Sequence, residues 1–367
     1  MKKIKYLLPL LVFNLSIVSC IQEDETPITL PLKTGSLMTL DDVAGPKQPH
    51  QVWIDISSGS IKTTHREDWD LGFYNGDQFR VVLNSSLMMA VGKIENTINI
   101  DAVNSQTVAA LKPLVHVGNF TDNSKYIDHP DGNITFQTSG ISAISPVDEM
   151  NPVYLLNMGF KTSAETNLVA GGVYTIGEER GWKKIRILQH PNGYKIQYAD
   201  LDEATHKEFI ITKDAEFNYQ FFSILKNNYA NIQPKKDSWD ICYTVFTNLT
   251  TNPSNNLPTS YIYPDFVTHN ILGGVGVYEV TTAVGQGNSE YNNFKISDVE
   301  SSKFVTTDQR TIGSNWRTTT GANGAEVFKN KFYILKNSKG IYYKLIFQRL
   351  KNNDGMRGYP QFEYQPL

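Results

Sequence analysis

Two copies of one short phrase constrain this chain more than any other feature of its sequence. The copies are Trp69-Asp70 and Trp239-Asp240, and each leads into an alternating apolar stretch that ends in Asn beside Ser or Thr. The two tryptophans lie 170 residues apart (239 minus 69), which is too far for a solenoid repeat and close to the length of one domain. Each copy also follows a further alternating stretch, at residues 51–59 and 217–224.

The alternation of apolar and polar residues predicts an all-β fold. Two hairpins are especially clear: 182–190 with 194–199 around Asn192-Gly193, and 331–336 with 341–347. A stretch at 101–112 is the one candidate for a short helix, ended by Pro113. We therefore predict two related sheet-rich, sandwich-like units with few short helices. The first spans residues 35–213 and the second spans residues 214–367.

The charge balance argues against a nucleic-acid partner. The chain has 34 Lys and Arg against 37 Asp and Glu, for a net charge of −3. The first 19 residues hold three lysines and no acid, so a processed chain would carry 31 basic against 37 acidic groups, or −6. Phosphate contacts need clustered Lys and Arg, and the sequence contains no such cluster.

The N-terminus is typical of an exported lipoprotein. Residues 1–20 combine a basic start, an apolar stretch too short to span a membrane, and Ile17-Val18-Ser19-Cys20, which resembles a bacterial lipobox. Cys20 would then carry acyl chains and anchor the protein, although an ordinary signal with a nearby Cys is the alternative. Residues 21–34 are expected to form a flexible acidic tether, whose Glu-Asp-Glu run either solvates the spacer or directs surface export.

A lipidated Cys20 leaves Cys242 as the only thiol, so no intramolecular disulfide is expected. Cys242 alternates with apolar neighbours in the second phrase and is expected to be a small buried residue.

With these features together, the chain resembles the HmuY family of Bacteroidetes surface lipoproteins. The resemblance rests on the repeated Trp-Asp phrase and on three later segments: 273–278, 313–317 and the hairpin 332–345. It implies a haemophore-like protein at the outer membrane and cell surface. Such a protein binds haem b without a covalent bond, takes it from host haemoproteins, passes it to a TonB-dependent outer-membrane receptor, and performs no catalysis.

The resemblance also indicates where axial ligands of a haem iron would lie. Met88 and Met89 directly follow the first key strand, His269 lies in the matching region of the second unit, and Met356 is a further loop methionine. For each methionine the alternative is packing in the core, and for the histidine it is a surface turn.

Two arginines, Arg80 and Arg357, are candidates to pair with haem propionates, with surface salt bridges as the alternative. His116 and His129 lie in turn-rich stretches and are expected to be exposed. The sequence contains no Cys-x-x-Cys-His for covalent haem and no His-Glu-x-x-His for zinc.

Enzymatic functions are not expected. The sequence lacks a Gly-x-Ser-x-Gly elbow and a phosphate loop. Asp68 and Asp70 could act as paired carboxylates, but the second copy has Ser238 in place of the first acid, which favours a structural role. The other class of function that remains is a surface adhesion module for glycans or proteins. That function would need exposed aromatic residues, whereas structural tryptophans at 69 and 239 would be buried.

Overall fold

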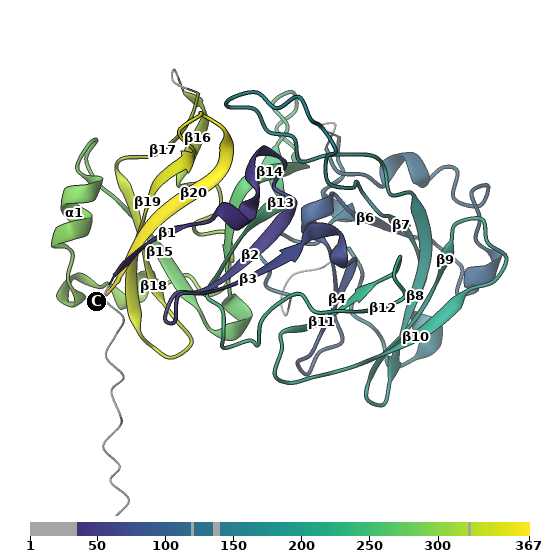
Figure 1. Cartoon of the computed structure of the whole chain (residues 1–367). Coiled ribbons are helices and arrows are strands. Elements are labelled where there is room, and N and C mark those ends of the chain that lie inside the picture. Colours follow the sequence, from purple (N-terminus) through teal and green to yellow (C-terminus); the bar gives the residue numbers. More distant parts are fainter. Residues whose placement is uncertain (1–34, 119–120, 135–139, 322–323) are drawn as a thin grey trace, which may run out of the picture. The chain divides into compact units, whose positions relative to one another are not determined.

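Antiparallel sheets form the framework of the structure, a computed structural model that describes residues 35–118, 121–134, 140–321 and 324–367 (Figure 1). The signal segment, Cys20 and the tether at 21–34 lie outside the described residues. The all-β prediction is confirmed: the described strands form five sheets, accompanied by one α-helix, α1 (Gly287–Asn293), and short 3-10 turns. No helix in the described ranges has the length and apolar character needed to cross a membrane.

The first pair of facing sheets is built from both ends of the chain. One sheet has the order β1 (Ser36–Thr39), β20 (Arg357–Pro366), β19 (Tyr342–Lys351), β18 (Lys331–Lys336) and β15 (Gly276–Thr281). The other has the order β14 (Pro258–His269), β13 (Ile241–Thr251), β2 (His50–Asp55) and β3 (Ser60–His65). A small hairpin, β16 (Arg317–Gly321) with β17 (Gly324–Val327), packs against this sandwich.

The second pair comes from a continuous stretch of chain. One sheet has the order β10 (Lys207–Thr212), β9 (Gly193–Asp200), β8 (Trp182–His190), β7 (Val153–Asn157) and β6 (Ala90–Lys93). The other has the order β12 (Asn228–Ala230), β11 (Tyr219–Ser223), β4 (Leu71–Tyr74) and β5 (Val81–Leu83).

Alternation along the strands explains why each sandwich has its own core. In the first sandwich Val52, Ile54 and Tyr243 point from β2 and β13 toward the sheet that contains Tyr333 and Leu345. In the second, the apolar residues of β4 and β5 meet those of β7, β8 and β9 in the same way. The opposite faces of the two four-stranded sheets carry a third cluster, which is rich in tryptophan.

The strands that precede each copy of the repeated phrase pair with strands of the other copy, an arrangement that we call the exchange of hairpins. Strands β1–β3 precede the first phrase but pair with the strands of the second: β2 lies beside β13, and β1 beside β20. Strands β10–β12 precede the second phrase but pair with the strands of the first: β11 lies beside β4, and β10 beside β9. In Figure 1 the purple strands β1–β3 accordingly lie among the green and yellow strands of the C-terminal part.

Strand pairing therefore groups the chain differently from the expected division at 213/214. That position falls between β10 and β11, inside the continuous stretch that builds the second sandwich. Contacts join residues 33–367 into one compact unit. The division into related units at 35–213 and 214–367 stays a prediction about the sequence repeat and marks no boundary in the sheets.

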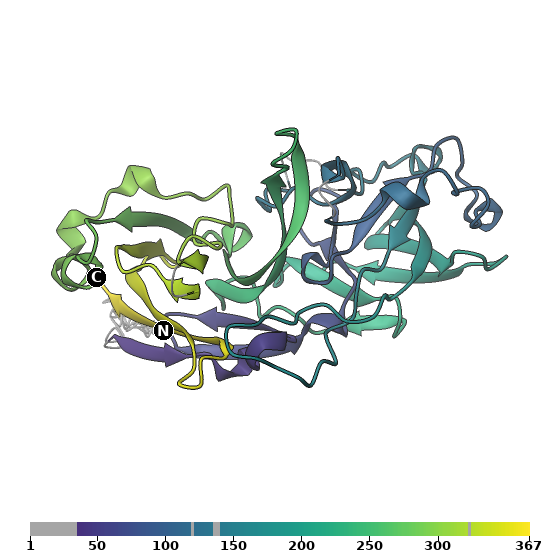
Figure 2. The ribbon, with the colours of Figure 1, turned by 90° about the horizontal axis from the view of Figure 1, so that it is seen from above.

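The local predictions were mostly confirmed. Both hairpins form as β8–β9 and β18–β19, and β13 and β14 extend into a long hairpin that projects in Figure 2. The helix expected at 101–112 is wrong: this stretch forms turns between two 3-10 segments. Side chains of Asn99 and Asn104 accept backbone N–H groups there, which competes with helix formation.

The 3-10 segments lie mostly at strand ends. They are η1 (Asp41–Val43), η2 (Gly45–Lys47), η3 (Arg66–Asp68), η4 (Ser85–Leu87), η5 (Ile100–Ala102), η6 (Lys112–Leu114), η7 (Ser124–Tyr126), η8 (Asp148–Met150), η9 (Ile271–Gly273), η10 (Ile296–Asp298) and η11 (Ser301–Lys303).

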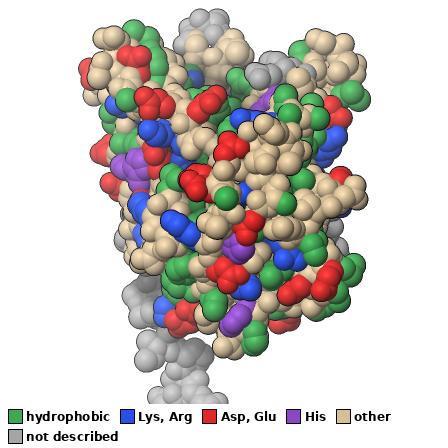
Figure 3. Space-filling view, turned by 90° about the vertical axis from the view of Figure 1, so that its right-hand side faces the viewer, with side chains coloured by type: hydrophobic (Ala, Val, Ile, Leu, Met, Phe, Trp, Pro, Cys, Tyr) green, Lys and Arg blue, Asp and Glu red, His purple; other side chains and the backbone are tan. Residues whose placement is uncertain are grey.

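On the face shown in Figure 3, Lys and Arg side chains are interspersed with Asp and Glu, so that face shows no single-sign region suited to a polyanion.

Candidate functional site

The two aspartates of the repeated phrase make the same structural bond. Asp70 Oδ2 accepts the backbone N–H of Ile224 at 2.7 Å, and Asp240 Oδ2 accepts that of Ile56 at 2.8 Å. Both carboxylates are buried, and each fixes the end of the strand donated by the other half of the chain. The aspartates of the phrase therefore have a structural role, as the sequence predicts: each stabilises the end of a neighbouring strand.

Two asparagines also correspond: Asn84, which follows β5, and Asn270, which follows β14. Asn84 Nδ2 donates to the carbonyl of Trp69 at 2.8 Å, and Asn270 Nδ2 donates to that of Trp239 at 3.0 Å. Each Asn also accepts a backbone N–H of the following 3-10 turn. The hydrogen bonds of Asp and Asn therefore correspond between the two copies at this end of the strands.

The copies differ in charge compensation. Asp70 forms a buried ion pair with Arg180, with Oδ1 and Nη2 2.6 Å apart. Asp240 forms no ion pair with any described residue, and burial raises the pKa of its carboxyl to about 7. Asp68 instead pairs with Lys226 near the surface, so Asp68 and Asp70 do not act together as paired carboxylates.

The repeated tryptophans are structural. Trp69 and Trp239 are each 5% exposed. Trp239 packs edge-on against Trp53 with ring centroids 4.9 Å apart, and Trp69 packs against Phe221 at 4.7 Å. A glycan platform built on these two residues is therefore not supported, since such a platform needs exposed rings.

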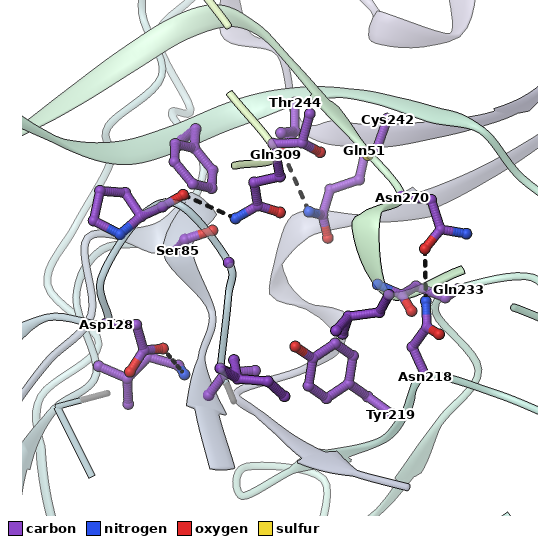
Figure 4. Close-up of a pocket in the computed structure, with 18 of the residues that line it drawn as sticks. Gln51, Ser85, Asp128, Asn218, Tyr219, Gln233, Cys242, Thr244, Asn270 and Gln309 are labelled. Atoms are coloured by element: carbon purple, nitrogen blue, oxygen red, sulfur yellow. Dashed lines mark hydrogen bonds between the residues drawn. The ribbon is translucent and has the colours of Figure 1, made fainter. Parts of the chain in front are cut away.

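A cavity of about 130 Å³ lies against this tryptophan cluster (Figure 4). Its walls come from β2, β5, β11, β13 and β14, together with the segment 127–134 and Gln309. Most of the wall is aromatic or aliphatic, with a few polar groups among the apolar ones. The polar side chains labelled in Figure 4 are Gln51, Ser85, Asp128, Asn218, Gln233, Thr244, Asn270 and Gln309.

His269 ends β14 and lines this cavity. Its side chain is almost fully buried at 1% exposure, and burial lowers the pKa of the imidazole to about 4. Nε2 lies 3.1 Å from the carbonyl of Val305, while Nδ1 has no hydrogen-bond partner among the described residues. The ring is therefore neutral at physiological pH, with Nε2–H donating and the lone pair of Nδ1 buried without a partner in the described residues. In the first copy Leu83 occupies the corresponding position.

Of the other predicted ligands, the fold brings only Met89 to the cavity of His269. Met89 is 1% exposed, packs in the core of the second sandwich and also lines the cavity. Met88 takes a left-handed conformation (φ 58°), packs against a different cluster and is absent from the cavity wall. Met356 lies in the β19–β20 turn, where its N–H donates to Asn352 Oδ1, and it too is absent from the wall.

Two arginine predictions have different outcomes. Arg357 is buried and forms an ion pair with Asp265, to which Tyr243 also donates at 2.6 Å, so its guanidinium is committed inside the first sandwich. Arg80 lies near Asp128, where its charge favours ionisation of that carboxyl.

The segment 127–134 supplies residues that the sequence did not indicate. Asp128 accepts the N–H groups of Leu83 at 2.6 Å and Gly140 at 3.0 Å, and burial raises its pKa to about 7. His129, expected to be exposed, is half-buried against the cavity and lies 3.0 Å from Asp131. The Asp-His-Pro-Asp-Gly sequence signalled a turn but gave no sign that the turn covers a cavity.

The donor residues suit a haem iron, but the volume of the cavity does not suit a whole haem. A neutral imidazole and a thioether are both haem ligands in proteins. A cavity of about 150 Å³ holds one benzene, so about 130 Å³ is far too small for a four-ring macrocycle. A haem would enter only if part of the wall moved.

Comparison with known proteins gives one family. The family described as HmuY protein matches residues 47–364, and no curated protein matches the chain. A solved structure also matches: the crystal structure of an inferred lipoprotein from Bacteroides fragilis NCTC 9343. The match covers 50% of this chain and 88% of the lipoprotein chain, with 15% sequence identity. Its TM-score of 0.22 does not establish a shared fold. Because the family match spans most of its length, the chain belongs to the HmuY family.

Proposed function

We propose that this protein is a haem-binding, haemophore-like lipoprotein of the cell surface that captures haem b for uptake through a TonB-dependent outer-membrane receptor. Membership of the HmuY family supports the haem ligand. The lipobox at Cys20 supports a lipid anchor in the outer membrane. Haem is the cargo of this protein and takes no part in a reaction on it.

The observation that carries the proposal is the meeting of His269 and Met89 at one apolar cavity. These residues are 180 positions apart (269 minus 89) and come from different sandwiches, yet both line the same space. Nδ1 of His269 is the iron ligand we propose, because a neutral imidazole binds iron without first losing a proton. The atom is buried, so it reaches iron only once the wall opens. The aromatic wall offers flat apolar surface for a macrocycle.

Entry of haem requires the wall to open, and the segment 127–134 is the part that we propose moves. Gln309 holds it from one side: its Nε2 donates to the carbonyl of Pro130 at 3.0 Å, and its backbone N–H donates to that of Asp131 at 2.8 Å. Asp128 holds it from the other side through Leu83 and Gly140. Breaking a few hydrogen bonds of about 1 kcal/mol each is within reach of ligand binding.

A haemin titration of residues 21–367 tests the proposal. We expect a saturable Soret band, with band positions in the oxidised and reduced states that report the axial ligands. His269→Ala should weaken haemin binding by tenfold or more and shift the band, and Met89→Ala should do so if it is the second ligand. Met88→Ala and Met356→Ala are matched controls, because neither residue lines the cavity. A featureless, non-saturating response would rule out haem as the ligand.

A further inference from the structure

Two histidines face each other across neighbouring strands of the first sandwich. His50 begins β2, His65 ends β3, and the two residues are directly opposite in the antiparallel register. Residues in such a pair place their side chains on the same face of the sheet, close enough to touch. The ring centroids lie 5.6 Å apart, and both residues are half-buried, so the pair stays within reach of solvent.

Hydrogen bonds leave one nitrogen of each ring uncommitted. His50 Nδ1 lies 2.7 Å from the carbonyl of Asp42, so Nδ1 carries the proton and Nε2 holds a lone pair. His65 Nδ1 accepts the backbone N–H of Glu67 at a long 3.3 Å. Neither Nε2 atom has a hydrogen-bond partner within the described ranges, and neither is enclosed, so both are open to solvent.

The separation of the rings suits a shared metal ion. At a Zn–N distance of about 2.1 Å and a tetrahedral angle, two imidazoles on one zinc ion have centroids about 5 Å apart. The observed 5.6 Å is close to that value. A hydrogen bond from Nδ1 to a backbone carbonyl, as in His50, is also the outer contact that a metal-binding histidine usually makes, because it fixes the tautomer that presents Nε2. His65 reaches the same tautomer at the loss of one long hydrogen bond, a cost of about 1 kcal/mol.

Of the nearby acids, Asp42 is the one with an uncommitted carboxylate. Glu67 Oε1 accepts two hydrogen bonds from Thr162, and Asp68 pairs with Lys226. The Asp42 side chain is exposed and has no partner in the part of the chain that the structure describes, and its own backbone carbonyl already contacts one ring. Turned toward the rings, this carboxylate would add an oxygen to two nitrogens, a ligand set that zinc takes with water in the fourth position.

We propose that His50 and His65 form a surface site for a divalent transition-metal ion, with Asp42 as the third ligand. Zinc, copper and nickel favour imidazole, whereas magnesium and calcium prefer oxygen ligands. The guanidinium of the neighbouring Arg66 is buried and donates to three backbone carbonyls, so it is held away from solvent. The site shares no residue with the cavity of His269 and does not depend on haem.

The test is calorimetric titration of Zn²⁺ into the untagged, haem-free chain (residues 21–367), with Mg²⁺ as the comparison. We expect saturable binding of one Zn²⁺ per chain, at least tenfold tighter than that of Mg²⁺. His50→Gln and His65→Asn should each weaken Zn²⁺ binding tenfold or more. His65→Asn keeps a side-chain acceptor at the N-cap of η3, so the turn is preserved while the imidazole is lost.

His206→Gln is the matched control, because His206 is another half-buried histidine, lies beside Asp101 and Glu208, and takes no part in this site. Electron paramagnetic resonance of one equivalent of Cu²⁺ on the native chain needs no variant, and should show coupling to two imidazole nitrogens. Absence of saturable Zn²⁺ binding, binding unchanged in both His50→Gln and His65→Asn, or Cu²⁺ coupled to fewer than two nitrogens would overturn the proposal. Haemin binding, measured separately by its Soret band, succeeds or fails independently of these results.

Discussion

The unequal charge compensation of the two repeated aspartates makes a sharp prediction about stability and pH. Asp240→Asn preserves the size of the side chain and an acceptor for Ile56 N–H, but removes a carboxylate that is buried without an ion pair. We expect the free energies of unfolding of the variant and the native protein to differ little near pH 5. Near pH 8 the variant should have the larger free energy of unfolding.

The magnitude follows from the pKa of Asp240, which burial raises from 3.8 to about 7. Between these values the folded state holds the proton more tightly than the unfolded state, so stability falls as pH rises through this window. At about 1.4 kcal/mol per pKa unit, the full loss is about 4 kcal/mol, of which about 2.5 kcal/mol falls between pH 5 and pH 8. The side chain is 3% exposed, so solvent screens little of this effect.

The assay is urea unfolding of residues 21–367 at pH 5 and pH 8 for the native protein and for Asp240→Asn. Asp70→Asn is the matched control, because it leaves Arg180 buried without its carboxylate and should cost about 3–5 kcal/mol at both pH values. Other groups also titrate in this range, so the quantity of interest is the difference between native protein and variant. A difference that stays constant from pH 5 to pH 8 would refute the reasoning.

Three further predictions concern the cover, the core and the thiol. Gln309→Ala removes a side-chain bond that holds the segment 127–134 and should raise the association rate of haemin severalfold in stopped-flow absorbance; an unchanged rate would show that another part of the wall opens. Arg357→Met leaves Asp265 without its closest cation and should lower the free energy of unfolding by about 3–5 kcal/mol in urea. Cys242 is 1% exposed with a raised pKa, so a thiol reagent should label it only in denaturant, and rapid native labelling would contradict its buried position.

The sequence predicts the parts of this fold that are encoded locally. The hairpins β8–β9 and β18–β19 depend on alternation around a short turn, and both formed where expected. The exchange of hairpins is not local: β2 pairs with β13, almost 190 positions away, and no turn or spacing specifies which copy of the phrase a lead-in strand will join. Two similar copies leave both pairings open in the sequence, so a division at 213/214 was the natural expectation.

Only those residues of the candidate site that lie beside a recognisable strand can be predicted from the sequence. Met89 is predicted because it follows the first key strand, and His269 because it lies in the matching region of the second unit; both line the cavity. Met88 was equally plausible by position, but its left-handed turn sends it to another cluster. Asp128 and the rest of its segment have no periodicity that would place them over a cavity. Arg357 looked free in sequence because its partner Asp265 lies 92 positions away.

The repeat also bears on how many ligands one chain can hold. The exchange brings equivalent faces of both four-stranded sheets to one cavity, so the two copies build a single site together. Within it the copies have diverged: His269 corresponds to Leu83, which has no donor atom for iron. We therefore expect haemin to titrate to one equivalent per chain, with the Soret signature of His269 removed by His269→Ala. Two equivalents of equal affinity would contradict a shared site, because they would require an independent pocket in each sandwich.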